Sequence, residues 1–146
     1  MKFTTDTVQE TQSFAATQCV EFPSGIVGFP NFKKAEILYQ ADQLPFMWLK
    51  GVGEEKIAFL VLEPGSLIPN YEIELTDADV TFLDLKNPSE AMVLIVATIQ
   101  GGKAKKILVN LVGPMVINRR TLKAKQVIIG NCQKYSARHV LYQEEA

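Results

Sequence analysis

A series of short segments in which apolar and polar residues alternate constrains this chain more than any other feature. The clearest is YEIEL (71–75), where Tyr71, Ile73 and Leu75 share one face and two glutamates share the other. Such alternation predicts a half-buried β-strand, because successive side chains of a strand point to opposite faces. Similar runs are TQCVEF (17–22), EILYQ (36–40), FMWLK (46–50), IAFLVLE (57–63), AMVLIVATI (91–99), KKILVNL (105–111), MVIN (115–118) and KQVIIG (125–130), with YSARHVLY (135–142) ambiguous. The chain is therefore predicted to form eight or nine short strands.

One helix and several turns are predicted between these strands. Thr76 and Asp79 have the spacing of a helix capping box, and the short helix that follows ends before Asn87-Pro88. QGGKA (100–104) is typical of a β-hairpin turn. We expect a mainly β fold: a compact, antiparallel, β-barrel-like single domain spanning residues 1–146 with one short helix. The polar residues 1–14 are expected to be a loose N-terminal arm.

Composition excludes several classes of protein. The chain has 146 residues, of which 47% are hydrophobic, and this is enough to form one hydrophobic core. Its formal net charge is −1, so the protein as a whole is not basic. No run approaches the roughly 18 apolar residues of a membrane span, and no secretory leader is evident. Cys19 and Cys132 have no metal-ligand spacing and suit a reducing compartment. We expect a cytoplasmic protein without cofactor, metal or membrane contact.

The segment FPSGIVGFP (22–30) resembles two kinds of phosphate-binding loop at first sight. A phosphate-binding loop requires a helix after its glycines, and here Phe29-Pro30 follows at once. An RNA-clamping Gly-x-x-Gly is usually supported by basic residues, and Ile26 and Val27 offer none. We interpret the segment as a turn between strands, held by Phe22, Ile26 and Phe29 packing beneath it.

The chain also lacks the residues of an active site. His139 is the only histidine, and a polar C-terminal segment with Arg138 beside it predicts a surface or packing role. Glu54-Glu55 suits a solvated turn, and Asp77 with Asp79 suits the first turn of a helix. There is no nucleophile elbow, zinc spacing or dinucleotide fingerprint, so an enzyme is not expected.

Charge is distributed unevenly along the chain. Residues 1–100 carry 6 basic and 14 acidic groups, whereas residues 101–146 carry 9 basic and 2 acidic groups. The segment 103–125 contains no acid and seven basic residues: Lys103, Lys105, Lys106, Arg119, Arg120, Lys123 and Lys125. If these form one patch, the alternative function is a small nucleic-acid-binding β-barrel. Aromatic residues are not interleaved with them as base stacking requires, which favours an acidic protein partner or a solvated rim.

Seven short motifs nevertheless resemble one family in order and spacing. They are GIVGFP (25–30), LPFMWL (44–49), FLVLEP (59–64), PNYEIEL (69–75), VNLVGPMVIN (109–118), KQVII (125–129) and YSARHVL (135–141). Together they identify the chain, from about Phe22 to Leu141, as resembling the flagellar assembly factor FliW. Two positions depart from the family pattern. Ala124 replaces an expected glycine, which disfavours a positive-φ turn there, and Val140 replaces a frequent proline, which favours a strand.

The resemblance implies a cytoplasmic binding protein with a β-barrel-like fold and no catalytic step. Its implied partners are flagellin and the RNA-binding translational regulator CsrA, with no direct nucleic-acid contact. Abundant unassembled flagellin would occupy the protein and leave the regulator free to repress flagellin translation; secretion of flagellin would reverse this. Such competition is a linkage effect between two ligands of one protein. The acidic N-terminal portion is the expected docking region for the basic regulator.

Nine residues are predicted to contact these partners. A disordered amphipathic helix of flagellin requires an apolar groove, and the candidates to line it are Phe46, Met47, Trp48 and Tyr71. The competing interpretation places Phe46 and Trp48 in the core. Asn110 and Asn118 flank the Gly113-Pro114 turn and are expected to satisfy its backbone groups. Gln126, Tyr135 and Arg138 occupy positions of the family motifs and complete the set.

Overall fold

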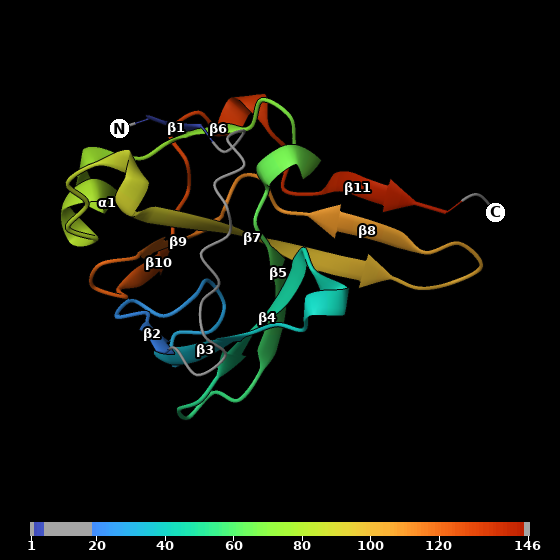
Figure 1. The fold of residues 1–146 in the computed structure, drawn as a ribbon, viewed down its shortest axis with the longest axis horizontal. Coiled ribbons are helices and arrows are strands. Elements are labelled where there is room, and N and C mark those ends of the chain that lie inside the picture. The colour runs from blue at the N-terminus through green and yellow to red at the C-terminus, as the bar shows by residue number, and fades with distance from the viewer. Residues whose placement is uncertain (1, 5–18, 145–146) are drawn as a thin grey trace.

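The computed structural model describes residues 2–4 and 19–144, which form a mainly antiparallel β-structure (Figure 1). The strands are β1 (Lys2–Thr4), β2 (Cys19–Glu21), β3 (Lys34–Leu38), β4 (Phe46–Gly51), β5 (Ala58–Leu62), β6 (Glu72–Glu74), β7 (Ala91–Gln100), β8 (Lys106–Val109), β9 (Met115–Asn118), β10 (Ala124–Gln126) and β11 (His139–Gln143). Within the described ranges there is one α-helix, α1 (Asp77–Phe82), and four short 3-10 helices: η1 (Ala41–Gln43), η2 (Gly65–Leu67), η3 (Pro88–Glu90) and η4 (Cys132–Lys134). The mainly β prediction with one short helix is confirmed.

Strand β7 organises the main sheet. Its first half pairs with β9 and its second half with β8, while its middle residues pair with β5, all antiparallel. The ladder order runs β10-β9-β7-β5-β4-β3-β2, and β8 and β11 extend from the second half of β7. No ladder joins β2 to β10 in the part of the chain described, so the sheet is not closed as a barrel. One parallel bridge, Glu21 to Lys123, connects its two ends.

The central part of this sheet is buried on both faces, in two hydrophobic clusters. Met92 and Leu94 of β7 belong to the cluster that contains Phe22, Phe32 and Leu49. The alternate residues Val93 and Ile95 belong to the other cluster. Because β7 is covered on both faces as far as Ala97, this part of its sequence is a nearly continuous apolar run rather than an alternating one. In β6 and the residues beside it, where the alternation is clear, Tyr71, Ile73 and Leu75 share one face and are buried.

Local signals in the sequence account for the helix and the glycine-containing turn. The Thr76 side chain caps α1, its Oγ1 accepting a hydrogen bond from the Asp79 N–H at 3.2 Å. Gly25 and Gly28 both have positive φ, and the backbone of Ile26 and Phe29 closes the turn between them. No helix follows these glycines, so the interpretation of FPSGIVGFP as a turn between strands is confirmed.

The structure shows the backbone conformation at Ala124 and Val140, the two positions that depart from the family pattern. Leu122, two residues before Ala124, adopts the left-handed conformation with φ of 63°. Ala124 itself lies buried in β10, where no positive φ is required. Val140 lies in β11, as its replacement of proline suggested.

Of the predicted N-terminal arm, residues 1 and 5–14 lie outside the described part of the chain. Residues 2–4 form β1, which pairs antiparallel with β6 and places Phe3 opposite Ile73. Among the described residues, no helix combines the length and apolar character needed to cross a membrane.

Candidate functional site

Three of the sequence motifs meet at one place on the surface. The Gln126 side chain connects them, because its Oε1 accepts a hydrogen bond from the Val27 N–H at 3.1 Å and its Nε2 donates to the Gly113 carbonyl at 3.1 Å. Val27 belongs to GIVGFP, Gly113 to VNLVGPMVIN and Gln126 to KQVII. The backbone of Val127 also donates to Pro114 at 3.0 Å. The side chain of Gln126 therefore joins segments that are far apart in the sequence.

The turn beside Gln126 is held equally firmly. Asn110 Oδ1 accepts hydrogen bonds from the N–H groups of Val112 and Gly113, each at 3.0 Å. A methyl group built on Gly113 would lie 3.3 Å from both Asn110 Nδ2 and Gln126 Nε2, and 3.6 Å from Ile128 Cδ1. A larger residue here would therefore require the Asn110 and Gln126 side chains to shift slightly. Asn110 thus satisfies the backbone of this turn, in agreement with its expected role.

Two large aliphatic side chains stand exposed on this frame. Val27 is 72% exposed and Ile128 is 56% exposed, while the adjoining Ile26, Val127 and Ile129 are buried beneath them. We call Val27, Gln126 and Ile128 the motif surface. Exposed aliphatic groups on a rigid backbone lose little conformational entropy on binding, which is the property of an interface anchor.

The four predicted groove residues are not brought together. Met47 is buried in the cluster with Leu49, and Tyr71 is buried in the opposite cluster, so neither lines a surface groove. Trp48 is 44% exposed and Phe46 is half-buried on the same face of β4. The competing core interpretation concerned Phe46 and Trp48; Phe46 packs against the cluster that contains Tyr71, whereas Trp48 is exposed.

Trp48 has apolar neighbours that were not singled out from the sequence. In register it lies opposite Leu60 of β5, which lies opposite Ala97 of β7. Ile99, two residues further along β7, shares the face of Ala97 and is exposed. We call Trp48, Leu60 and Ile99 the tryptophan face. The alternation in β7 is obscured by its apolar residues on both faces, which is why Ile99 was missed.

Tyr135 contacts the edge of β6 rather than solvent alone. Its hydroxyl accepts a hydrogen bond from the Glu72 N–H at 3.0 Å and donates to the Asn70 carbonyl at 3.3 Å. Its ring packs edge-on against Tyr71, with centroids 4.9 Å apart. Asn131, which the sequence did not indicate, assists by accepting from the Glu74 N–H at 3.0 Å and donating to the Glu72 carbonyl at 2.7 Å. These side chains take the place of a neighbouring strand.

The buried side chain of Tyr71 is held by a hydrogen bond inside the protein. Its hydroxyl donates a hydrogen bond to the Leu111 carbonyl at 2.6 Å. Burial raises the pKa of Tyr71, and the neighbouring Tyr135 raises it further. Tyr71 is therefore a structural residue that fixes the position of the segment containing Leu111.

Asn118 supports a different turn from the one expected. Its amide nitrogen donates to the Leu83 carbonyl at 2.7 Å and to the Asp84 carbonyl at 3.2 Å. Its Oδ1 accepts from the N–H groups of Arg120 at 2.8 Å and Thr121 at 3.2 Å. The side chain is fully buried and holds the 119–121 turn against the end of α1, not the Gly113-Pro114 turn.

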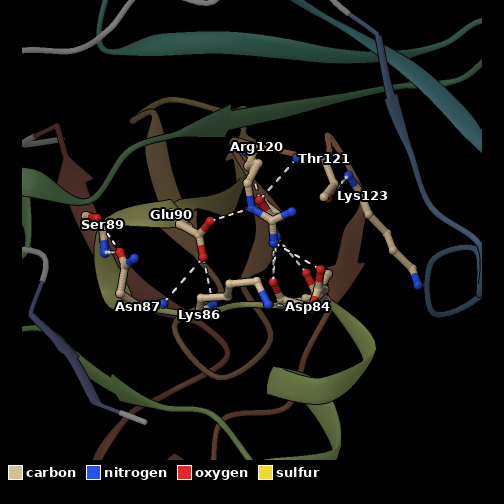
Figure 2. A network of polar contacts seen from close by, with 10 residues as sticks. Asp84, Lys86, Asn87, Ser89, Glu90, Arg120, Thr121 and Lys123 are labelled. Carbon is tan, nitrogen blue, oxygen red and sulfur yellow. Dashed lines mark hydrogen bonds and ion pairs between the residues drawn. The ribbon is translucent and has the colours of Figure 1, made fainter.

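Arg120 joins this region to the loop before β7 (Figure 2). Its Nε donates to Glu90 Oε2 at 2.6 Å, and its Nη2 donates to the Asp84 carbonyl at 2.8 Å and to Asp84 Oδ2 at 3.0 Å. The Arg120 guanidinium lowers the pKa of both carboxyl groups.

The basic segment 103–125 does not form one patch. Lys103, Lys105 and Lys106 lie at or beside the tip of the β7–β8 hairpin, away from α1 in Figure 1. Lys125 Nζ lies 2.5 Å from Asp79 Oδ1, and Lys123 Nζ lies 4.2 Å from the centre of the Phe82 ring. With Arg120 paired to Asp84 and Glu90, a continuous RNA-binding strip is absent from the described residues. Three acidic residues from the first hundred, Asp79, Asp84 and Glu90, pair with Lys125 and Arg120 of this segment.

Arg138 and His139 are exposed near the start of β11, and the Arg138 N–H donates to Ser136 Oγ at 3.0 Å. No group of three or more histidine, cysteine or acidic side chains able to hold a metal occurs in ranges 2–4 and 19–144.

Comparison with known proteins bears on the same residues. A model of the family described as FliW protein matches residues 3–141. The flagellar assembly factor FliW of Thermosipho africanus is 32% identical over 124 residues, covering 85% of each chain. That of Desulfitobacterium hafniense strain Y51 is 34% identical over 134 residues, covering 92% of this chain and 87% of its own. A crystal structure of the flagellar assembly factor FliW superimposes with a TM-score of 0.73 at 29% identity, covering 89% of both chains.

Proposed function

The chain belongs to the FliW family of flagellar assembly factors, and we propose that it acts in the cytoplasm by binding flagellin and a CsrA-type translational regulator. As a member of this family it is an assembly factor and not an enzyme, as predicted. Binding of flagellin and of the regulator is mutually antagonistic, so that flagellin translation follows filament assembly. This requires only that each partner lowers the apparent affinity of the other.

The observation that carries this proposal is the motif surface. Val27 and Ile128 are large, apolar and exposed, and the Gln126 side chain holds the backbone of Val27 and of Gly113 by hydrogen bonds. Side chains of this kind stabilise a folded monomer little, because most of their surface remains in water. Their energetic contribution arises when a partner covers them. We assign the motif surface to the regulator.

The tryptophan face supports the assignment of flagellin. Trp48 and Ile99 are exposed and Leu60 is half-buried, which leaves an apolar area over β4, β5 and β7. An amphipathic helix binds such an area with residues one turn apart, and a tryptophan is among the commonest anchors of binding energy. Trp48 and Phe46 are thus retained from the predicted groove, whereas Met47 and Tyr71 act in the core.

The experiment is calorimetric titration of the purified protein with each partner. Val27→Asp and Ile128→Asp are expected to weaken regulator binding at least about tenfold, since each places a charge in an apolar contact. Trp48→Ala is expected to do the same for intact flagellin, and flagellin lacking its C-terminal helical region should not bind.

Val52→Asp is the matched control, because Val52 is an exposed aliphatic residue beyond β4 that belongs to neither surface. It should bind both partners like the unaltered protein. If Val27→Asp and Ile128→Asp bind the regulator normally, the motif surface is not its docking site. Failure of the unaltered protein to bind either partner would refute the proposed function itself.

A further inference from the structure

The second half of β7, with β8 and β11, forms an arm that extends away from the body of the molecule (Figure 1). The residues of β7 beyond Ala97 are exposed, so this part of the sheet is not covered on both faces. Neither the motif surface nor the contacts of Asn118 lie on β11. Ile99 of the tryptophan face lies on β7 within this arm, but β11 carries no residue of either surface, so the proposed function leaves β11 without a role.

Strand β11 is the outer strand of this arm. Among the residues described, β8 is its only strand partner, through a register that places Val140 opposite Leu108 and Tyr142 opposite Ile107. The pairing continues beyond the strand, where the Glu144 N–H donates to the Lys105 carbonyl at 2.9 Å. The edge facing away from β8 consequently presents alternate N–H and C=O groups that no described strand pairs.

This edge lacks most of the features that normally protect an outer strand. Proteins usually place lysine, proline or glutamate there. Here Val140 is 43% exposed and Tyr142 is 51% exposed. They point to opposite faces of the sheet, because their partners Leu108 and Ile107 are successive residues of β8. The irregularity between Val140 and Tyr142 is the one protective feature present.

Charge at the two ends of β11 indicates the kind of partner. Lys103 and Lys105 are exposed beside its C-terminal end and Arg138 is exposed beside its N-terminal end. The one described acid on the arm is Glu144, whose carboxylate accepts a hydrogen bond from the Lys105 N–H at 3.2 Å. A second copy of this chain would bring like charges together, and a basic segment would be repelled.

We propose that the free edge of β11 binds an extended acidic segment of a protein partner by strand addition. The backbone of that segment pairs with β11, its apolar side chains pack on the face that carries Val140, and its carboxylates lie near Lys105 and Arg138. Backbone pairing supplies affinity in this mode, and the alternating side chains supply specificity. RNA is not favoured, because Tyr142 is the one exposed Phe, Tyr or Trp ring on the described part of the arm and base stacking requires a series.

The test uses a fluorescein-labelled peptide of alternating glutamate and valine and the full protein. We expect saturable binding by fluorescence anisotropy, with shifts of the ¹⁵N amide signals of residues 139–143. A peptide with proline at its central valine, which cannot donate to the edge, should bind at least about tenfold more weakly. A lysine-for-glutamate peptide should also bind more weakly.

Protein variants locate the site. The double variant Lys105→Glu, Arg138→Glu is expected to lose at least about tenfold in affinity. Lys34→Glu, Lys50→Glu is the matched control, since both residues are exposed on β3 and β4 and should leave binding unchanged. Trp48→Ala should also retain it, which separates this site from the tryptophan face. A dispersed NMR spectrum confirms that each variant folds.

Four results would overturn the proposal. Equal binding of the proline-containing peptide would exclude strand addition. Amide shifts outside β11 would place the site elsewhere. Displacement of the peptide by a single-stranded RNA 12-mer, or stronger shifts of the β11 amides with that RNA, would identify RNA as the occupant, and a dimer formed through β11 in sedimentation would identify a second copy of this chain.

Discussion

Side-chain amides hold much of the irregular backbone of this protein. Asn110 and Asn118 each accept hydrogen bonds from two backbone N–H groups of a turn. Asn118 differs because it is fully buried and also donates to two carbonyls near the end of α1. Buried groups without partners cost more than exposed ones, because water cannot replace the lost bonds.

Asn118→Ala is therefore expected to lower the free energy of unfolding by about 3 kcal/mol, since several buried backbone groups lose their partner. Asn110→Ala should cost about 1 kcal/mol, because its turn is nearer to solvent. Urea unfolding of both variants checks this order. Equal losses would mean that burial does not decide the contribution of these amides.

The raised pKa of Tyr71 predicts how the stability of the protein changes in alkali. Its pKa is raised in the folded protein above the ordinary value of 10.0. Above that pH an unfolded tyrosine releases its proton while folded Tyr71 retains it, so rising pH favours unfolding. The stability linked to this group is complete below about pH 10 and is lost as pH increases further.

Tyr71→Phe should therefore show a shallower decline in the free energy of unfolding between about pH 10 and pH 11.5 than the unaltered protein. Urea unfolding at a series of pH values measures this decline in the free energy of unfolding. Tyr142→Phe, at an exposed tyrosine, is the control and should retain the original slope. An unchanged slope in Tyr71→Phe would show that Tyr71 titrates alike in both states.

At the scale of elements, the loop between α1 and β7 is fastened by Arg120. Asp84 there has a φ of 51°, a left-handed conformation uncommon outside glycine. Arg120 binds both its carbonyl and its carboxylate and reaches Glu90 in η3. One side chain after β9 thus positions the segment that leads into the central strand.

Acid should weaken this fastening. The pKa values of Asp84 and Glu90 are lowered in the folded state, chiefly by hydrogen bonds from Arg120. Their stabilising effect is complete above the unfolded pKa values near 4 and is lost as pH falls through the lower folded values. Arg120→Gln should flatten the decline of stability between about pH 5 and pH 2.5, as measured by urea unfolding. Lys86 Nζ lies farther away, 3.8 Å from Asp84 Oδ1, so Lys86→Gln should flatten the decline of stability less.

At the scale of the whole molecule, β7 and β11 differ most clearly in strand pairing and in burial. β7 pairs with β5, β8 and β9 and is largely buried, whereas β11 pairs with β8 alone among the described strands and is largely exposed. Amide exchange from β7 residues 92–95 is expected to require global unfolding, whereas β11 should open locally at lower free energy.

Hydrogen exchange at several urea concentrations distinguishes the two. The β7 amides should depend on urea as steeply as global unfolding, and the β11 amides should show almost no dependence. Amides of β9, which is buried throughout, serve as the reference for global exchange. If β11 exchanged only through global unfolding, its edge would be too stable to be described as an independent surface.

The sequence by itself determined where most strands, the helix and the turns lie. Period-two alternation, the Thr76 cap and the glycine turns are local, since each depends on the geometry of a few neighbouring residues. Tertiary structure alone decided that Trp48 is exposed while Met47 and Tyr71 are buried. It also decided that Gln126 reaches Val27, 99 residues away, and that the basic segment is divided among acidic partners. These outcomes depend on which strands become neighbours and in what register, and that is set by burying two apolar clusters together rather than by any single segment.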